Sequence, residues 1–348
     1  MNILPILIAI GTYTANTASE GIYIMELDIQ NQQFRKVQTL TARNPSYLRY
    51  LDKKSTLYYV EEIGLGTINA TKLNHNSGKF EQTSSASTQG SSPCHIGVSP
   101  DETTLIASNY SSGNFSTFSL LPDGHIGEKL SSYVFYANSV NPNRQKQSHV
   151  HSAFYTSNGK KVFIQDLGGD HIYQFDAKNI RADSRPFLTH TMTAGSGPRH
   201  LTFHSNKQFV YIVNELNGTI DTYSLNKKGE IKDHIQNISA DSRNGDNLCA
   251  HIRLSPDEKY LYASNRGEKN SISVFAIQAD GRLQHIQTIG TEGKNPRHFE
   301  CTPDGNWMIV ANQQSNNLSL FARDKSSGLL TFSGIKIDIP APVCIAML

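Results

Sequence analysis

Two segments of the sequence, "GPRH" and "VYIVNEL", carry side chains suited to acid–base and anion chemistry. The first contains Arg199 and His200, and the second contains Glu215, about 16 positions after Arg199. A guanidinium binds phosphate or carboxylate through paired donors, whereas the pKa of a histidine or glutamate can be tuned for proton transfer. Apolar positions alternate in both segments, which favours two strands joined by a turn. If the two strand ends meet, these residues form a candidate site.

The same residue types recur at comparable places along the chain. His149 and His151 stand in "HVHSAF", Arg266 stands in "SNRG", and Arg297 and His298 stand in "NPRHF". On a strand, His149 and His151 would face the same way and could bind a metal ion. No acidic or histidine cluster with ligand spacing accompanies them, so we expect no metal and no cofactor.

The segments around these residues are copies of one repeat. Each copy reads as a short apolar strand, a turn such as "SPDE" or "TPDG", a second strand that ends at Asn or Asp, another turn and a third strand. A fourth, more variable segment follows. Six copies are visible, beginning near Asn44, Ser92, His149, Gly195, Leu248 and Asn295.

One set of spacings fixes the register of the repeat. The second strands end at Asn109, Asp166, Asn214, Asn265 and Asn312, about 57, 48, 51 and 47 residues apart. The same spacings lead from Cys94 to His151, Arg199, Ala250 and Arg297. A period near ~50 residues with four strands per unit is typical of β-propeller blades. We interpret the Asn and Asp residues as turn-forming groups that bond the local backbone.

The repeat predicts an all-β fold, a seven-bladed β-propeller with four antiparallel strands per blade. The seventh blade is assembled from both chain ends, with "IPAPVCIAML" as its inner strand and "ILIAIGTYT" and "EGIYIMEL" beside it. Pairing of the N- and C-terminal strands would close the ring and remove open sheet edges. We expect a single domain over residues 1–348.

Antiparallel pairing places the start of each first strand beside the end of the second strand. Because the first strands line the central channel, the candidate residues should converge at one channel mouth. They are His149, His151, Arg199, His200, Glu215, Arg266 and Arg297, with His95, His298 and Asp166 close by. Several cations around one or two carboxylates suit an anionic substrate. His95, His200 and His298 share one column of the repeat, so a packing role is the alternative for them.

Composition argues against several other functions. The net charge is +2 and no run of Lys or Arg occurs, so we expect no binding to nucleic acid or to a membrane. The four cysteines form no CxxC pair, which fits a reducing compartment and no disulfide framework. No stretch approaches the ~20 apolar residues that cross a bilayer. We interpret the apolar start "MNILPILIAI" as a buried strand rather than a signal peptide, and expect a cytoplasmic protein.

The segments "GPRHLTFH…VYIVNEL", "LSPDEKYLYASNRG", "SPCHIGVSP…ASNY" and "HVHSAF…VFIQDLGGD" resemble the seven-bladed lactonase propellers. That family includes bacterial propeller-type 6-phosphogluconolactonases and fungal carboxy-muconate lactonizing enzymes. The resemblance implies that His151 is the family's motif histidine, with His149 beside it. It assigns the other functional positions to Arg199, Glu215 and Arg266.

Two positions depart from the family pattern. Ser148 stands where many relatives have Pro, and His251 stands where an acidic residue is common. The second departure removes one expected carboxylate from the site, which bears on substrate preference and pH response.

The resemblance implies hydrolysis of 6-phospho-D-glucono-1,5-lactone to 6-phosphogluconate in the pentose phosphate pathway. Arg199 and Arg266, with Arg297 as a further candidate, would hold the phosphate and polarise the lactone carbonyl. His151 or Glu215 would act as the general base on water, and the other would help the ring oxygen to leave; which residue takes which role stays open. The remaining expected substrate-binding residues are His149, His200 and His298.

Two alternatives remain beside this expectation. One is a lactonase or cycloisomerase that acts on a carboxylated or non-phosphorylated lactone with the same cations. The other is a non-enzymatic propeller that serves as an interaction platform, with a binding surface away from the channel mouth. The sequence leaves the oligomeric state undetermined.

Overall fold

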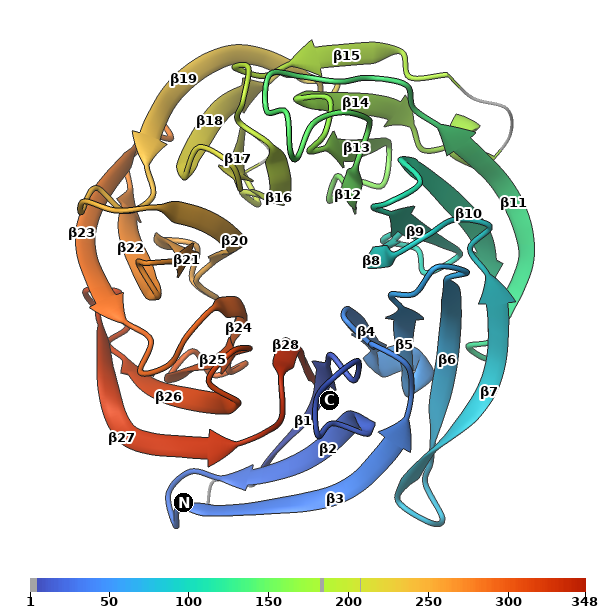
Figure 1. Cartoon of the computed structure of the whole chain (residues 1–348), viewed down its shortest axis with the longest axis vertical. Helices are drawn as coiled ribbons and strands as arrows, with labels where there is room; N and C mark the ends of the chain where they lie inside the picture. The colour runs from blue at the N-terminus through green and yellow to red at the C-terminus, as the bar shows by residue number, and fades with distance from the viewer. Residues whose placement is uncertain (1–4, 182–184, 207) are drawn as a thin grey trace.

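The computed structural model describes residues 5–181, 185–206 and 208–348. The strands of these residues form seven sheets of four antiparallel strands, arranged as blades around a central axis (Figure 1). The predicted seven-bladed β-propeller is therefore confirmed. The described part of the chain holds no helix with the length and hydrophobicity of a membrane span.

Six blades follow one another along the chain, each written here from its inner strand outward. They are β4 (Leu48–Leu51), β5 (Thr56–Glu61), β6 (Thr67–Asn74) and β7 (Lys79–Ser87); β8 (Pro93–Val98), β9 (Thr104–Asn109), β10 (Asn114–Leu120) and β11 (Ile126–Val134); β12 (Val150–Tyr155), β13 (Lys161–Asp166), β14 (His171–Asp176) and β15 (Leu188–Thr191); β16 (Pro198–Phe203), β17 (Phe209–Asn214), β18 (Thr219–Leu225) and β19 (Ile231–Ser239); β20 (Asn247–Leu254), β21 (Tyr260–Gly267), β22 (Ser271–Ile277) and β23 (Leu283–Gly290); and β24 (Pro296–Cys301), β25 (Trp307–Asn312), β26 (Asn317–Arg323) and β27 (Leu330–Asp338). Two short 3₁₀ turns, η1 (Asp52–Lys54) and η2 (Asn179–Arg181), lie in the connections.

The seventh blade joins the two ends of the chain. Its inner strand is β28 (Pro342–Met347), followed outward by β1 (Ile6–Thr12), β2 (Gly21–Asp28) and β3 (Gln33–Thr41). Ile8 pairs with Met347 and Ile10 pairs with Ile345, so the predicted closure of the ring is confirmed. The expected buried strand in "MNILPILIAI" begins at Ile6; residues 1–4 lie outside the described part of the chain.

The hydrophobic core lies between neighbouring blades. In one cluster, Ile309 and Leu320 of one blade pack with Ile8 and Ile345 of the next, and all four are nearly inaccessible to solvent. Burial of such side chains is the main stabilising contribution to a fold of this kind.

The Asn and Asp residues at the ends of the second strands were predicted to bond the local backbone. Asp166 does so, since its Oδ1 accepts from the backbone N–H groups of Gly168 and Gly169. Asn214 instead bonds a side chain of the neighbouring strand, donating from Nδ2 to Asp221 Oδ2 at 2.7 Å.

Six inner strands carry a β-bulge near their start, and those of β8, β12, β16 and β24 have the same form. In each of these four, the pairing register shifts by one residue, for example between Pro198 and His200 in β16. A bulge leaves the extra residue out of the ladder and re-aims its side chain. The extra residues are Cys94, His151, Arg199 and Arg297.

Candidate active site at one mouth of the channel

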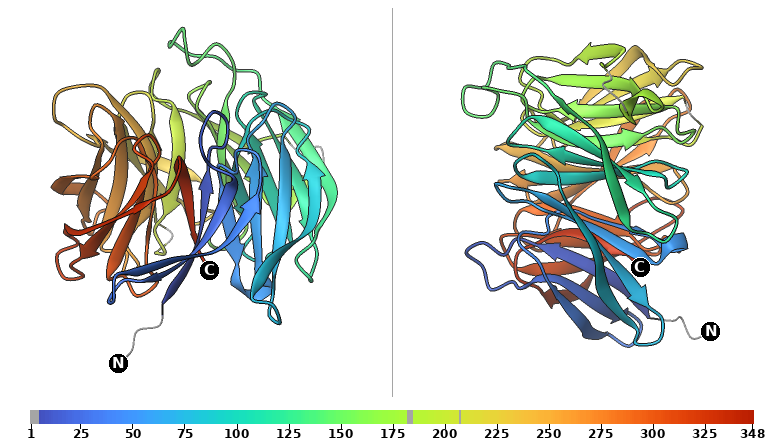
Figure 2. Two further views of the ribbon diagram at one scale, coloured as in Figure 1. Left: turned by 60° about the horizontal axis from the view of Figure 1, so that its bottom comes forward. Right: turned by 90° about the vertical axis from the view of Figure 1, so that its right-hand side faces the viewer.

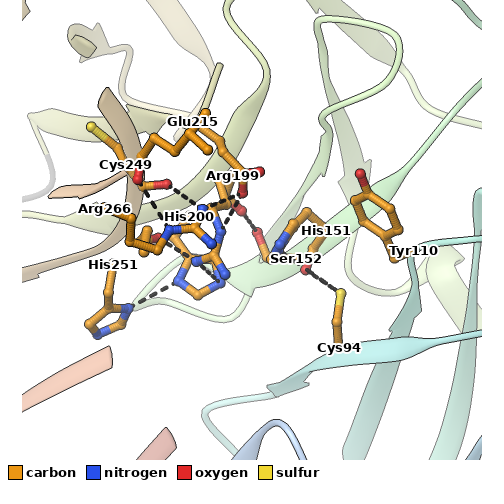
Figure 3. Close-up of polar contacts among 12 residues, drawn as sticks. Cys94, Tyr110, His151, Ser152, Arg199, His200, Glu215, Cys249, His251 and Arg266 are labelled. Carbon is orange, nitrogen blue, oxygen red and sulfur yellow. Dashed lines mark hydrogen bonds and ion pairs between the residues drawn. The ribbon is translucent and has the colours of Figure 1, made fainter. Parts of the chain in front are cut away.

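Glu215 is the centre of the candidate site. Its Oε2 lies 2.9 Å from Nε of Arg199 and 2.9 Å from Nη2 of Arg266, and its Oε1 lies 2.6 Å from Nη2 of Arg144. Figure 3 shows Arg199 and Arg266 reaching Glu215 from two neighbouring blades. Three guanidinium groups therefore share one carboxylate.

The local fold explains why Arg199 and Glu215 meet. Pro198 pairs with Asn214 in the β16–β17 ladder, so the residues that flank this pair lie side by side. The backbone N–H of Glu215 donates to the carbonyl of Gly197 at 2.8 Å. The predicted meeting of the two strand ends is confirmed.

Two of the guanidiniums are also anchored to backbone carbonyls of β20. Arg266 donates to the carbonyl oxygens of Leu248 and Cys249 at 3.1 and 3.0 Å, and Arg199 donates to that of Ala250. Both side chains are almost fully buried, at 8% and 3% exposure. Their positions are thus set by the scaffold before any substrate arrives.

The electrostatics of the cluster keep Glu215 ionised. Burial raises the pKa of Glu215, but the charges of Arg266, Arg199 and Arg144 outweigh it and hold this pKa well below its usual range. Burial and the charges of Arg266 and Arg297 lower the pKa of Arg199. A guanidinium nevertheless stays protonated at neutral pH. The cluster therefore carries a surplus of positive charge.

His151 lies beside this cluster on the adjacent inner strand. Its imidazole approaches the ring of Tyr110 at 5.8 Å and that of His200 at 5.3 Å, and its Nδ1 lies 4.0 Å from Sγ of Cys94. Burial and the charge of Arg199 hold the pKa of His151 well below its usual value, so the ring is neutral. A neutral imidazole can accept a proton from water.

His149 has a different environment from His151. Its ring stacks on Tyr110 at 4.3 Å, and its Nδ1 lies 2.9 Å from the carbonyl oxygen of the same residue. Its backbone N–H donates to Oδ1 of Asp166 at 2.7 Å, which also accepts from Gly168 and Gly169. Asp166 therefore stabilises the turn that follows β13. His149 lies at the edge of the mouth, where its ring stacks on Tyr110.

Arg297 enters the mouth from the opposite side. Its guanidinium lies 5.2 Å from the centre of the Tyr13 ring, and the Tyr13 hydroxyl donates to Oε2 of Glu62 at 2.8 Å. Burial alone would lower the pKa of Arg297, but the neighbouring Tyr13, Glu62 and Glu215 together raise it. Four guanidiniums thus face two carboxylates around this mouth, which leaves a surplus suited to an anion.

A layer of aromatic rings closes the channel beneath the site. His200 Nδ1 lies 3.0 Å from His251 Nδ1, and the His251 ring stacks on His298 at 4.0 Å. Tyr47 approaches His95 at 4.3 Å and His200 at 6.1 Å. Burial holds the pKa values of these histidines below their usual range. We call Tyr47, His95, His200, His251 and His298 the ring layer.

The sequence-predicted residues are thus divided between two levels. Arg199, Glu215 and Arg266 are in direct contact, with His151 and Arg297 beside them. His200 lies one level below, where its Nε2 is 3.3 Å from Nη1 of Arg199. His298 also belongs to the ring layer, and its Nδ1 accepts from the backbone N–H of Ile345 at 3.3 Å.

Arg144 and Tyr110 were not identified from the sequence. Arg144 lies in the long connection between β11 and β12, outside the repeat, and donates to both Glu215 and the Tyr110 hydroxyl. In Figure 2 a long green loop rises above one face of the ring. The sequence did contain a sign of this long connection, because the spacing of about 57 residues from Asn109 to Asp166 exceeds the other spacings between the ends of the second strands.

The described residues contain no group of three or more His, Cys, Asp or Glu side chains placed to hold a metal ion. The four cysteines are buried and unpaired. What the mouth does offer is a neutral imidazole next to fixed, buried guanidiniums. This arrangement can activate water and stabilise a developing negative charge.

Comparisons with known proteins agree with this geometry. Residues 7–347 match the family model described as "Lactonase, 7-bladed beta-propeller". The chain is 31% identical to a 6-phosphogluconolactonase of Bacillus subtilis (strain 168) over 97% of both proteins, and 32% identical to one of Formosa agariphila over 92% of this chain and 93% of the relative.

Solved structures are similar over nearly the whole chain. A periplasmic gluconolactonase of Pseudomonas aeruginosa superposes with a TM-score of 0.92 at 28% identity, covering 99% of each chain. A putative 6-phosphogluconolactonase of Bacteroides fragilis gives a TM-score of 0.89 at 29% identity, over 99% of this chain and 98% of the other.

Proposed function

Since the chain belongs to the lactonase family of seven-bladed β-propellers, we propose that it is a 6-phosphogluconolactonase that hydrolyses 6-phospho-D-glucono-1,5-lactone to 6-phosphogluconate. Relatives of that name at 31% and 32% identity support the assignment. The single observation that carries it is the neutral His151 beside guanidiniums fixed on Glu215, in a mouth with surplus positive charge.

The proposed role of His151 is that of general base. Among the described residues its Nε2 has no hydrogen-bond partner, and its lowered pKa keeps it unprotonated at neutral pH. It takes a proton from water while the water oxygen attacks C1 of the lactone. The C1–O5 bond then breaks, and the imidazolium returns the proton to O5, so the reaction consumes one water and leaves the enzyme unchanged.

Glu215 is better suited to hold the cations than to accept a proton. Three guanidiniums contact its two oxygens, and they hold its pKa well below the usual range despite burial. A carboxylate with so low a proton affinity is a weak base. Glu215 instead positions Arg199 and Arg266, which stabilise the oxyanion that forms at the lactone carbonyl.

We assign the phosphate group of the substrate to Arg144 and Arg297, which lie outside the contacts between Glu215, Arg199 and Arg266. Arg144 is 36% exposed and uses Nη2 for Glu215 and Tyr110, while Arg297 rests on the ring of Tyr13 from the other side. A guanidinium with free N–H groups binds phosphate through paired donors. The proposal includes a role in the pentose phosphate pathway and a cytoplasmic location for the enzyme, in line with its unpaired cysteines.

The test is hydrolysis of freshly prepared 6-phosphoglucono-1,5-lactone, corrected for its spontaneous opening, by wild type and by Arg199→Ala and Glu215→Gln. Arg282→Ala is the matched control, because this arginine is 56% exposed and pairs only with Asp280 among the described residues. We expect a large rate above background in wild type and control, and its loss in both site variants. No acceleration by wild type would refute the assignment.

Glucono-1,5-lactone without phosphate is the second candidate substrate. The Pseudomonas aeruginosa neighbour, which superposes with a TM-score of 0.92, is named a periplasmic gluconolactonase. Comparison of kcat/KM for the two lactones separates the candidates. A preference for the phosphorylated lactone that disappears in Arg144→Ala supports the first, and equal turnover of both supports the second.

A further inference from the structure

The channel has a second cavity at the end opposite to Glu215. Its volume is about 350 Å³, which is within the range of small-molecule sites. Inner strands β4, β20, β24 and β28 provide the walls. The side chains that matter for its chemistry are Tyr47, Arg49, Tyr50, Arg253, His298 and Glu300.

The ring layer separates this cavity from the first site. Arg297 and Glu300 belong to the same strand, β24, but Arg297 is at the first mouth and Glu300 lines the second cavity. Between them, His298 contacts His251 at 4.0 Å and Tyr47 at 6.2 Å. Since side chains alternate along a strand, His298 and Glu300 face the channel at successive levels.

Charge in the cavity is unbalanced. Nε of Arg253 lies 2.6 Å from Oε1 of Glu300, which is 10% exposed and also accepts from the backbone N–H of Cys301. The Arg49 side chain is exposed, lines the same cavity and has no hydrogen-bond or ion-pair partner among the described residues. The cavity therefore presents two guanidiniums and only one carboxylate among these side chains.

Hydrogen-bond donors in the cavity also lack acceptors. Arg253 is 44% exposed and uses only Nε for Glu300, so its terminal N–H groups have no partner in the described part of the chain. The Tyr47 hydroxyl is likewise unpaired there, and burial raises its pKa, so it retains its proton. Free donors and a net positive charge favour an anion with several oxygen acceptors.

We propose that this cavity, defined by Arg49, Arg253 and Tyr47, is a second binding site for a small metabolite that carries a phosphate or carboxylate group. The guanidiniums bind its anionic group, and the Tyr47 and Tyr50 side chains contact the rest of the molecule. The ring layer keeps it apart from the Glu215 cluster. The site does not depend on the function proposed for the first mouth.

The test is isothermal titration calorimetry with inorganic phosphate and, separately, citrate. The double variant Arg144→Ala/Arg297→Ala serves as the background, because it removes the two cations assigned to anion binding at the first mouth. We expect this background to bind one anion, and the addition of Arg49→Ala to weaken that binding at least tenfold, in keeping with the loss of a charge-assisted hydrogen bond. The preferred probe tells a phosphate site from a carboxylate site.

Two further variants make the result decisive. Arg253→Gln combined with Glu300→Gln in the Arg144→Ala/Arg297→Ala background removes both members of the ion pair, so no buried charge is left alone, and should also abolish binding. Arg282→Ala in the same background is the control and should bind as before. Circular dichroism confirms that each variant is folded. Absence of binding to Arg144→Ala/Arg297→Ala at millimolar anion, or binding unaffected by the added Arg49→Ala, would overturn the proposal.

Discussion

Oε2 of Glu215 accepts from Nε of Arg199 and from Nη2 of Arg266 at the same distance, 2.9 Å. Arg199 comes from the inner strand of one blade and Arg266 from the second strand of the next. A single carboxylate oxygen therefore ties two neighbouring blades together at the channel mouth. In the proposed mechanism both cations are thereby held in place to stabilise a developing negative charge without reorganisation.

Replacement of Glu215 by Gln should destabilise the protein as well as inactivate it. Arg199 is 3% exposed and would lose its only carboxylate partner among the described residues. Removing one member of a buried ion pair costs about 3–5 kcal/mol. Urea denaturation at pH 7 measures the loss, with Arg282→Ala as the control. A free energy of unfolding equal to that of wild type would contradict it.

His151→Gln should reduce kcat with little change in KM. The amide retains much of the side-chain volume but cannot accept a proton, and general-base catalysis contributes about 10²–10⁴-fold. Steady-state kinetics on the phosphorylated lactone measure both constants. If kcat is retained in His151→Gln, the base is another group.

The activity should persist below the usual histidine pKa. Burial and Arg199 lower the pKa of His151, so protonation of the base occurs only at more acidic pH than about 6.5. We expect kcat/KM to stay flat from pH 7.5 to below 6.5, and to fall only at still more acidic pH, where the imidazole gains its proton. A decline that begins above pH 6.5 would exclude His151 as the base.

Arg144→Ala should raise KM for the phosphorylated lactone about tenfold while kcat changes less. Loss of one hydrogen bond to a charged group corresponds to roughly 1.5–3 kcal/mol. Glu215 keeps its contacts with Arg199 and Arg266, so the variant should remain folded. The matching measurement with glucono-1,5-lactone should show no such rise, and equal effects on both substrates would remove Arg144 from the phosphate site.

The ring layer should make the protein sensitive to acid. In the folded state, burial and the charge of Arg253 lower the pKa of His298 to about 3, whereas the unfolded chain protonates this residue near pH 6.5. The unfolded state therefore binds more protons between these values, and the free energy of unfolding falls as the pH falls through this window.

His298→Asn should reduce that pH dependence. One histidine contributes up to about 1.4 kcal/mol per pH unit in this range. Urea denaturation of wild type and variant at pH 7.5, 6 and 5 compares the slopes. The variant should be less stable at pH 7.5 but lose less on acidification, and identical slopes would contradict the shifted pKa.

The repeat could be recognised from local residues alone. Turns such as that at Asp257 and strand ends such as Asn214 depend on short-range hydrogen bonds, so they leave a pattern that recurs about every ~50 residues. The pairing of Arg199 with Glu215 followed from the same pattern, because antiparallel neighbours place their ends together. The number of blades and the closure of the ring were predicted for this reason.

Other features depended on tertiary structure. The contact of Arg144 with Glu215 spans 71 positions and comes from a loop outside the repeat. The bulge at Arg199 and the stacking of His251 on His298 depend on the pairing register and on the meeting of separate blades around the axis. No local pattern encodes these distances.

The sequence by itself thus determined the blades and the residue types at the mouth, because strand periodicity and turn chemistry are local. Only the tertiary structure decided the charge states of His151 and Glu215 on which the proposed roles rest. Burial and neighbouring charge keep His151 neutral and Glu215 ionised, and both effects arise from groups brought together across the channel.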